Sequence, residues 1–243
     1  MNIKRFLTVL IVFLLAFRIS YAQLFPNLAI FGGPSAGWHF NNTNDLNNEL
    51  SKAGFPNLVN GFFTLGGGGY IDLPMKVGFL RIGGMGSGFS TNLSAAVNDS
   101  LTKALNYNFG MGGLSLEYVR PFGNFDIIGG AVFSTGTLKL DLYQYGKDNG
   151  NYGSILGEFS NNSSSQNITR NFKVRFFSVQ PQISLGLLVK KFLYFKLTGG
   201  YLITANGTWK VDNNVDVPQF PKGIKANGFN INLSVNAGIF FRD

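Results

Sequence analysis

The stretch Phe229–Phe241, with the sequence FNINLSVNAGIFF, alternates between apolar odd-numbered positions and mostly polar even-numbered positions. Because successive side chains of a β-strand point to opposite faces, this pattern gives one apolar and one polar face. Ordinary strands have about 5–6 residues, whereas a tilted strand that crosses a bilayer needs about 9–11. The segment therefore predicts a membrane-crossing strand. Its expected lipid-facing residues are Phe229, Ile231, Leu233, Val235 and Ile239.

Seven further segments repeat this alternation or an apolar run of similar length. They span residues 28–39, 61–72, 76–88, 107–121, 125–142, 177–189 and 192–208. In the segment 125–142 apolar residues fall on both faces, so the pattern leaves its inward face open. Together with the last strand, these segments predict an all-β fold of eight strands.

The connections between these strands alternate in length. Short links lie near 73–76, 122–125 and 189–192, and long links rich in Asn, Ser, Asp and Gly lie near 40–60, 89–106, 143–170 and 207–227. Transmembrane barrels have short turns at the periplasmic end and long loops outside. The spacing therefore predicts an eight-stranded antiparallel up-and-down transmembrane β-barrel with four long outer loops.

The first long loop contains a short helical pattern. Asp45 to Ala53 can form a helix, with Asn44 as its N-terminal cap and Gly54 as its stop.

Composition agrees with a membrane barrel better than with an ordinary soluble domain. The 243 residues are 45% apolar but only 13% charged, against about 25% charged in typical soluble domains. The chain has no cysteine, so disulfides cannot hold it together. The formal charge of +8 is spread without a basic run, which argues against nucleic acid as a partner.

The N-terminus has the pattern of a secretory signal peptide. Lys4 and Arg5 precede an apolar run over 6–17, and Ser20-Tyr21-Ala22 supplies small residues for cleavage after Ala22. The apolar run would extend about 18 Å as a helix, which is short for a hydrocarbon core of about 30 Å. The expected division is a signal peptide over 1–22 and an outer-membrane β-barrel over 23–243.

This order of strands and loops resembles the small eight-stranded outer-membrane barrels, namely the OmpA/OmpX-like group and the barrels common in Bacteroidota. The resemblance covers the mature chain as a pattern of strands and loops, without a residue motif. It implies the outer membrane of a Gram-negative cell envelope, with outer-membrane lipid as a partner. The aromatic-ended final strand, in which Arg242 and Asp243 follow Phe241, implies recognition by the barrel-assembly machinery.

An eight-stranded barrel is just wide enough for side chains to fill its interior. Polar residues that face inward must pair with one another, since an unpaired buried charge is costly. Arg81 and Glu117 are the best predicted pair, because each stands about six residues from its own short turn on neighbouring strands. The expected lumen polar network is completed by Lys196, Gln180, Gln182, Asn232 and Asn236. Such a network fills the lumen, or alternatively lines a narrow ion path.

Three function classes remain open. The first is a non-enzymatic barrel that presents its loops to an extracellular ligand, for adhesion or binding. The second is a lipid-modifying enzyme, because eight-stranded lipid A acyltransferase barrels use a His, an Asp and a Ser, and His39, Asp99 and Ser100 supply these types here. We find no motif for a metal or a cofactor and expect neither.

The third class is a secreted lipocalin-like carrier of an apolar ligand, which would place its apolar face inside. Aromatic residues near the short turns favour a membrane girdle instead. They are Phe122, Phe125, Phe192, Tyr194, Phe240 and Phe241.

Two prolines, Pro34 and Pro181, fall within expected strands. Each removes a ladder donor, so a bulge or an edge above the membrane is expected. A lateral opening for a lipid chain is the alternative.

Overall fold

A computed structural model describes residues 28–99, 101–146, 167–221 and 223–241 of the chain. The expected signal peptide and its cleavage site lie outside the described residues.

The described chain forms eight long strands and one short hairpin. The strands are β1 (Ala29–Asn41), β2 (Phe62–Pro74), β3 (Phe79–Asn98), β4 (Leu101–Phe122), β5 (Phe125–Gly146), β6 (Ile168–Lys190), β7 (Leu193–Asn206) and β10 (Gly228–Phe240). The hairpin consists of β8 (Lys210–Val211) and β9 (Val215–Asp216) and is joined to β6.

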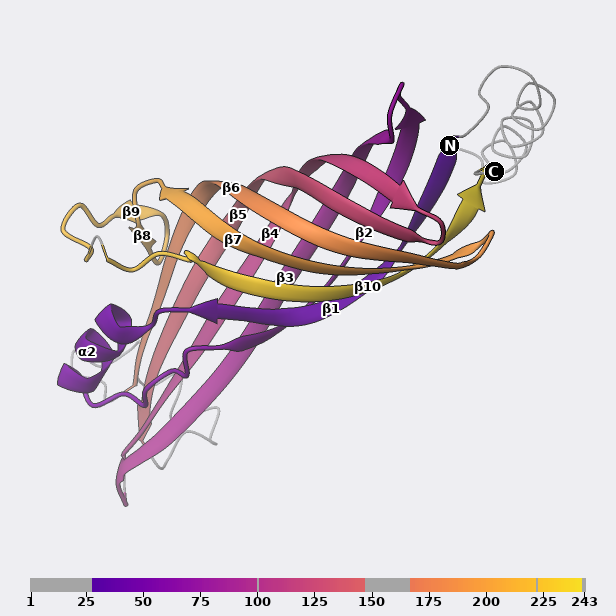
Figure 1. Cartoon of the computed structure of the whole chain (residues 1–243). Coiled ribbons are helices and arrows are strands. Elements are labelled where there is room, and N and C mark those ends of the chain that lie inside the picture. The colour runs from indigo at the N-terminus through magenta and orange to yellow at the C-terminus, as the bar shows by residue number, and fades with distance from the viewer. Residues whose placement is uncertain (1–27, 100, 147–166, 222, 242–243) are drawn as a thin grey trace, which may run out of the picture.

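The strands form a closed ring. Each long strand is antiparallel to the next, and β1 pairs with β10 from Ala29↔Phe240 to Asn41↔Gly228. Figure 1 shows that β1 begins and β10 ends at one end of the barrel, while α2 and the β8–β9 hairpin lie at the other. The predicted eight-stranded, antiparallel, up-and-down barrel is confirmed.

Alternation in sequence becomes two faces of the wall. The odd-numbered residues of β10 are exposed on the outer surface, from Val235 at 39% to Ile239 at 60%, whereas Ser234 and Asn236 are buried inside. Outward-facing Leu, Ile, Val and Phe on the other strands continue the apolar outer face. In aqueous solution this apolar surface would be exposed to water all around the ring, which is unfavourable for a soluble protein.

The first outer loop contains α2 (Asn44–Lys52), close to the expected Asp45–Ala53. The helix begins one residue earlier, so Thr43 and not Asn44 is the N-cap residue, and its side chain makes no capping hydrogen bond. Gly54 follows the helix with a φ of +72°, a conformation that favours glycine. Among the described residues, no helix is long and apolar enough to span a membrane.

The expected loop over 89–106 is wrong, because β3 continues to Asn98 and β4 begins at Leu101, and the two strands pair as one long hairpin. β6 likewise begins at Ile168 rather than near 177. These outer extensions carry polar residues such as Asn92 and Asn106, and their composition is typical of a loop. Inward-facing Leu105 and Tyr107 are nevertheless buried, and their packing keeps the extended hairpin on the barrel.

The expected bulges at the prolines are also wrong. Pro34 pairs with Gly67 of β2 and Pro181 with Ala131 of β5, both without a register shift. On its other side Pro34 interrupts the ladder of the described strands β1 and β10, which resumes in the same register at Ser35↔Ser234. Proline has no N–H to donate, so each strand stays regular but loses pairing on one side.

Candidate functional site

A buried network of charges crosses the lumen, and Arg81 of β3 lies at its centre. Its guanidinium donates two hydrogen bonds to Asp72, from Nε to Oδ1 at 2.6 Å and from Nη2 to Oδ2 at 3.0 Å. Two further carboxylates are 3.8 Å away, Glu117 from Nη1 and Asp126 from Nη2. Tyr194 bridges the group, since its hydroxyl donates to Asp126 at 2.7 Å and lies 3.4 Å from both Nη atoms. Arg81 is thus surrounded by acceptors on four other strands.

Glu117 of β4 is the second centre of this network. Its Oε1 accepts hydrogen bonds from Lys196 Nζ at 2.5 Å, Gln182 Nε2 at 2.5 Å and Ser115 Oγ at 3.0 Å. Its Oε2 is buried without a hydrogen bond in the described structure and faces Arg81 only at ion-pair distance. The stronger ion partner of Glu117 is therefore Lys196.

Strand register brings these groups together. Asp72, Arg81 and Glu117 are direct cross-strand partners on β2, β3 and β4, so their side chains lie side by side inside the barrel. Glycines leave the space that the network needs. A Cβ on Gly130 would press on Glu117, and one on Gly186 would collide with the Tyr194 hydroxyl.

The structure brings Arg81 and Glu117 together, as the sequence suggested, but assigns each a closer partner. Sequence reasoning missed Asp72, although the alternation of its strand already placed it inside. It missed Asp126 because the apolar residues of that strand fall on both faces.

Tyr194 and Phe240 correct the expected aromatic girdle. Both are buried inside the barrel, where they contact each other and Phe31. Arg81 lies over the rings of Phe31 and Tyr194, at 4.7 and 5.1 Å. Such contacts with an aromatic face stabilise a desolvated cation. The other four residues of the expected girdle, Phe122, Phe125, Phe192 and Phe241, are exposed on the outer surface.

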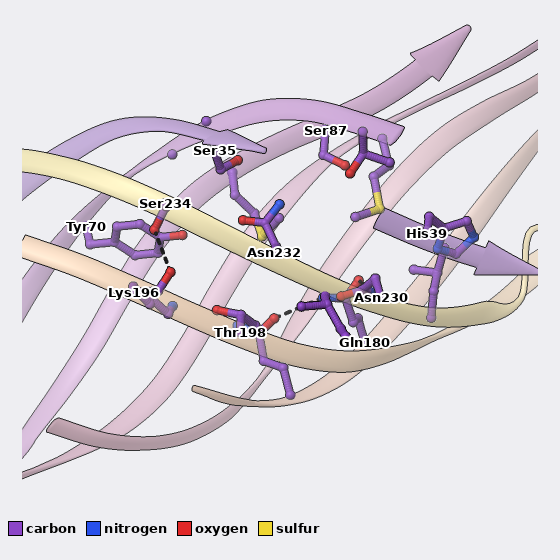
Figure 2. A pocket seen from close by; sticks show the side chains of 18 of the residues that line it. Ser35, His39, Tyr70, Ser87, Gln180, Lys196, Thr198, Asn230, Asn232 and Ser234 are labelled. Carbon is purple, nitrogen blue, oxygen red and sulfur yellow. Dashed lines mark hydrogen bonds between the residues drawn. The ribbon is translucent and has the colours of Figure 1, made fainter. Parts of the chain in front are cut away.

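A small polar chamber of about 40 Å³ lies in the lumen beside the network. Figure 2 shows Tyr70 at one end and His39 at the other, with Lys196, Gln180 and Asn232 between them. The volume suffices for a few water molecules, since each needs about 10–15 Å³ by this measure.

The expected amides of the network occupy different places around this chamber. Gln180 donates to Gln182 and accepts from Asn230, so this chain of amides extends the charge network. Asn236 instead donates to Ser234 Oγ at 2.9 Å, and its Oδ1 is buried without a partner in the described structure. Asn232 lines the chamber.

Above the chamber, an aromatic layer closes the lumen. It consists of His39, Phe62, Phe89, Phe109 and Phe176, whose rings stack in nearly parallel pairs. Two of the outer connections pack on this layer, the one between β1 and β2 through Leu46 and Leu50 of α2, and the one between β7 and β10 through Trp209, Ile224 and Ala226. The aromatic layer was not predicted, because the alternation in the sequence suggested polar side chains throughout the interior.

His39 and Asp99, two of the three residues of the enzymatic alternative, do not lie in one site. His39 is buried, stacks on Phe109 at 5.6 Å, and its Nε2 lies 3.1 Å from the carbonyl oxygen of Ala226. Asp99 is exposed at the tip of the β3–β4 hairpin. Ten residues of extended chain, about 33 Å, separate Asp99 from Phe89, which stacks on His39. Ser100 lies outside the described residues.

No family model matches the chain, and no curated protein matches it. Among solved structures, it is similar to the attachment invasion locus protein Ail of Yersinia pestis, at 10% identity and a TM-score of 0.35, over 89% of this chain and 99% of that one. Ail in complex with the heparin analogue sucrose octasulfate is similar at 10% identity and a TM-score of 0.31, with the same coverage. The outer membrane protease OmpT of Escherichia coli is similar at 11% identity and a TM-score of 0.35, over 88% of this chain and 96% of that one. At these scores the likenesses add no weight to any assignment made from the residues themselves.

Proposed function

We propose that this chain is a non-enzymatic outer-membrane barrel that presents its outer loops for adhesion or binding. The observation that carries the proposal is the closed ring with an apolar outer face and a charged, hydrogen-bonded interior. A closed barrel can span a bilayer because the pairing of every strand leaves no backbone N–H or C=O group unsatisfied in lipid. Its apolar outer face is more stable in contact with lipid than with water.

The interior favours a structural role for the network. Ion pairs and amides fill the lumen near the short turns, and the aromatic layer with its loops fills the outer mouth. The chamber between them is enclosed by side chains and is too small for an open pore. A lipocalin-like carrier needs the opposite arrangement, with a polar outer surface and an apolar cavity.

The first prediction concerns location. The mature chain is expected to begin at Gln23 and to fractionate with the outer membrane, because its outer face is apolar. Membrane fractionation with N-terminal sequencing measures both properties. A protein that stays soluble without detergent, or that retains Met1, would contradict the proposal.

The second prediction separates structure from catalysis at His39. His39→Ala removes a ring from the aromatic layer and leaves a cavity, so the barrel is expected to melt at a lower temperature. His39→Phe keeps the ring and should restore most of this stability. Neither variant should change the acylation of lipid A or phospholipid, measured by mass spectrometry of cells with and without the protein. Acyl transfer that both variants abolish would establish the enzymatic alternative instead.

A further inference from the structure

A row of basic residues crosses the outer wall of the barrel on three paired strands. Lys139 of β5 is directly opposite Lys173 of β6, and Lys173 is directly opposite Lys210 of β8. Arg175 lies two residues from Lys173 on the same face of β6. We call Lys139, Lys173, Arg175 and Lys210 the basic rim.

The basic rim faces outward. Its neighbours along the strands, Leu138, Val174 and Trp209, are buried inside the barrel, so the alternation directs the rim away from the lumen. Lys139, Arg175 and Lys210 are exposed, and Lys173 is half-buried.

Like charges directly opposite one another in a sheet are destabilising. Lys210 pairs with Asp216 at 3.1 Å, and Asp141 lies two residues from Lys139 on the same face. None of the ion pairs among the described residues includes Lys139, Lys173 or Arg175. Four cations thus face two carboxylates, and an anion bound between them would offset their repulsion.

The rim stands where the outer face changes from apolar to polar. On β6, the outward residues from Phe177 to Leu187 are apolar, which matches the length of about 9–11 residues that crosses a bilayer. Arg175 and Lys173 follow directly toward the outer loops, and Asn171 and Thr169 come next. An open hollow of about 900 Å³, lined in part by Arg175, Phe177 and Thr137, adjoins the rim.

We propose that the basic rim binds the phosphate groups of a phosphorylated lipid in the outward-facing leaflet, with part of that lipid in the adjoining hollow. The inference rests on the proposed membrane location. At the lipid–water boundary a phosphate meets Lys139, Lys173 and Arg175 together, and charge-assisted hydrogen bonds to phosphate are strong.

Native mass spectrometry of the full mature chain, folded in detergent micelles, tests this inference. The probe is diphosphorylated lipid A, compared with the same lipid after removal of both phosphates. Replacing Lys139, Lys173 and Arg175 with glutamine is expected to weaken binding of the phosphorylated lipid on the order of 100-fold, since each basic residue near an anionic lipid contributes about fivefold. Binding of the dephosphorylated lipid should not change.

The matched control replaces Lys76, Lys190 and Lys191 with glutamine at the short-turn end, which removes the same charge from exposed positions. This control should bind like the unchanged protein. In the absence of lipid, the rim variant should melt no earlier than the unchanged protein, because it loses like-charge repulsion between facing cations and none of the ion pairs among the described residues.

Equal weakening in the control, or equal binding of both lipids, would overturn the inference while leaving the barrel in the membrane. Competition by millimolar inorganic phosphate would assign the rim to a free anion and overturn the lipid as its ligand. A chain that remains soluble without detergent would overturn the proposed function itself.

Discussion

Replacing Glu117 with alanine is expected to lower the free energy of unfolding by about 3–5 kcal/mol, because removing one partner of a buried ion pair leaves the other uncompensated. The group left without its counter-charge is Lys196, which donates a hydrogen bond to Glu117 at 2.5 Å and is only 3% exposed. Arg81 keeps its two hydrogen bonds to Asp72 and loses much less. Urea unfolding of the barrel in lipid vesicles measures the change.

A double-mutant cycle assigns the partner. Glu117→Ala combined with Lys196→Met should cost clearly less than the sum of the two single changes, since contacting residues couple. The cycle of Glu117→Ala with Arg81→Met should show a smaller coupling, because those groups are 3.8 Å apart. Additivity in the first cycle would contradict the ion pair with Lys196.

Replacing Val235 with arginine is the second change with a large expected effect. Val235 is 39% exposed near the middle of the outward face of β10. An arginine at the bilayer midplane of a barrel costs about 2–4 kcal/mol. Unfolding in lipid vesicles should therefore require less urea for Val235→Arg than for the unchanged chain.

The control for this prediction is Thr169→Arg, an outward position of β6 beyond the apolar stretch. Near or above the interface the same charge costs about 0–1 kcal/mol. Asn236 cannot serve as the control, because it is fully buried and an arginine there would overfill the lumen. Equal losses at Val235 and Thr169 would contradict the assignment of the outer face to lipid.

The strands of the ring could be predicted from the sequence because apolar and polar residues alternate wherever one face of a strand lines the lumen and the other lies on the outer surface. It failed in the outer extensions of β3 and β4, where residues such as Asn92 and Asn106 weaken the contrast between faces. There the order comes from tertiary packing of Leu105 and Tyr107 beneath the loops, which composition does not reveal.

The charge network could be predicted only in part. Arg81 and Glu117 were found because their distances from two short turns set them level on adjacent strands. Lys196 was found as an inward cation, but its closeness to Glu117 depends on how the ring closes across the lumen. Tyr194 was assigned to the outer surface because an aromatic residue near a turn can belong either to a membrane girdle or to the interior. Only its burial in the structure distinguishes these two positions.

Ring closure between β1 and β10 has a consequence for how the molecule assembles. Ala29 pairs with Phe240, so this ladder joins segments about 200 residues apart in the chain and raises the contact order, which slows folding. Before β10 pairs with them, β1 and β7 each have an edge of unpaired backbone donors and acceptors, and such edges can pair with other chains and aggregate. The ladder that closes the ring is interrupted at Gly33 and Pro34, so closure has to form two separate runs of pairs, from Ala29↔Phe240 to Gly32↔Ala237 and from Ser35↔Ser234 to Asn41↔Gly228.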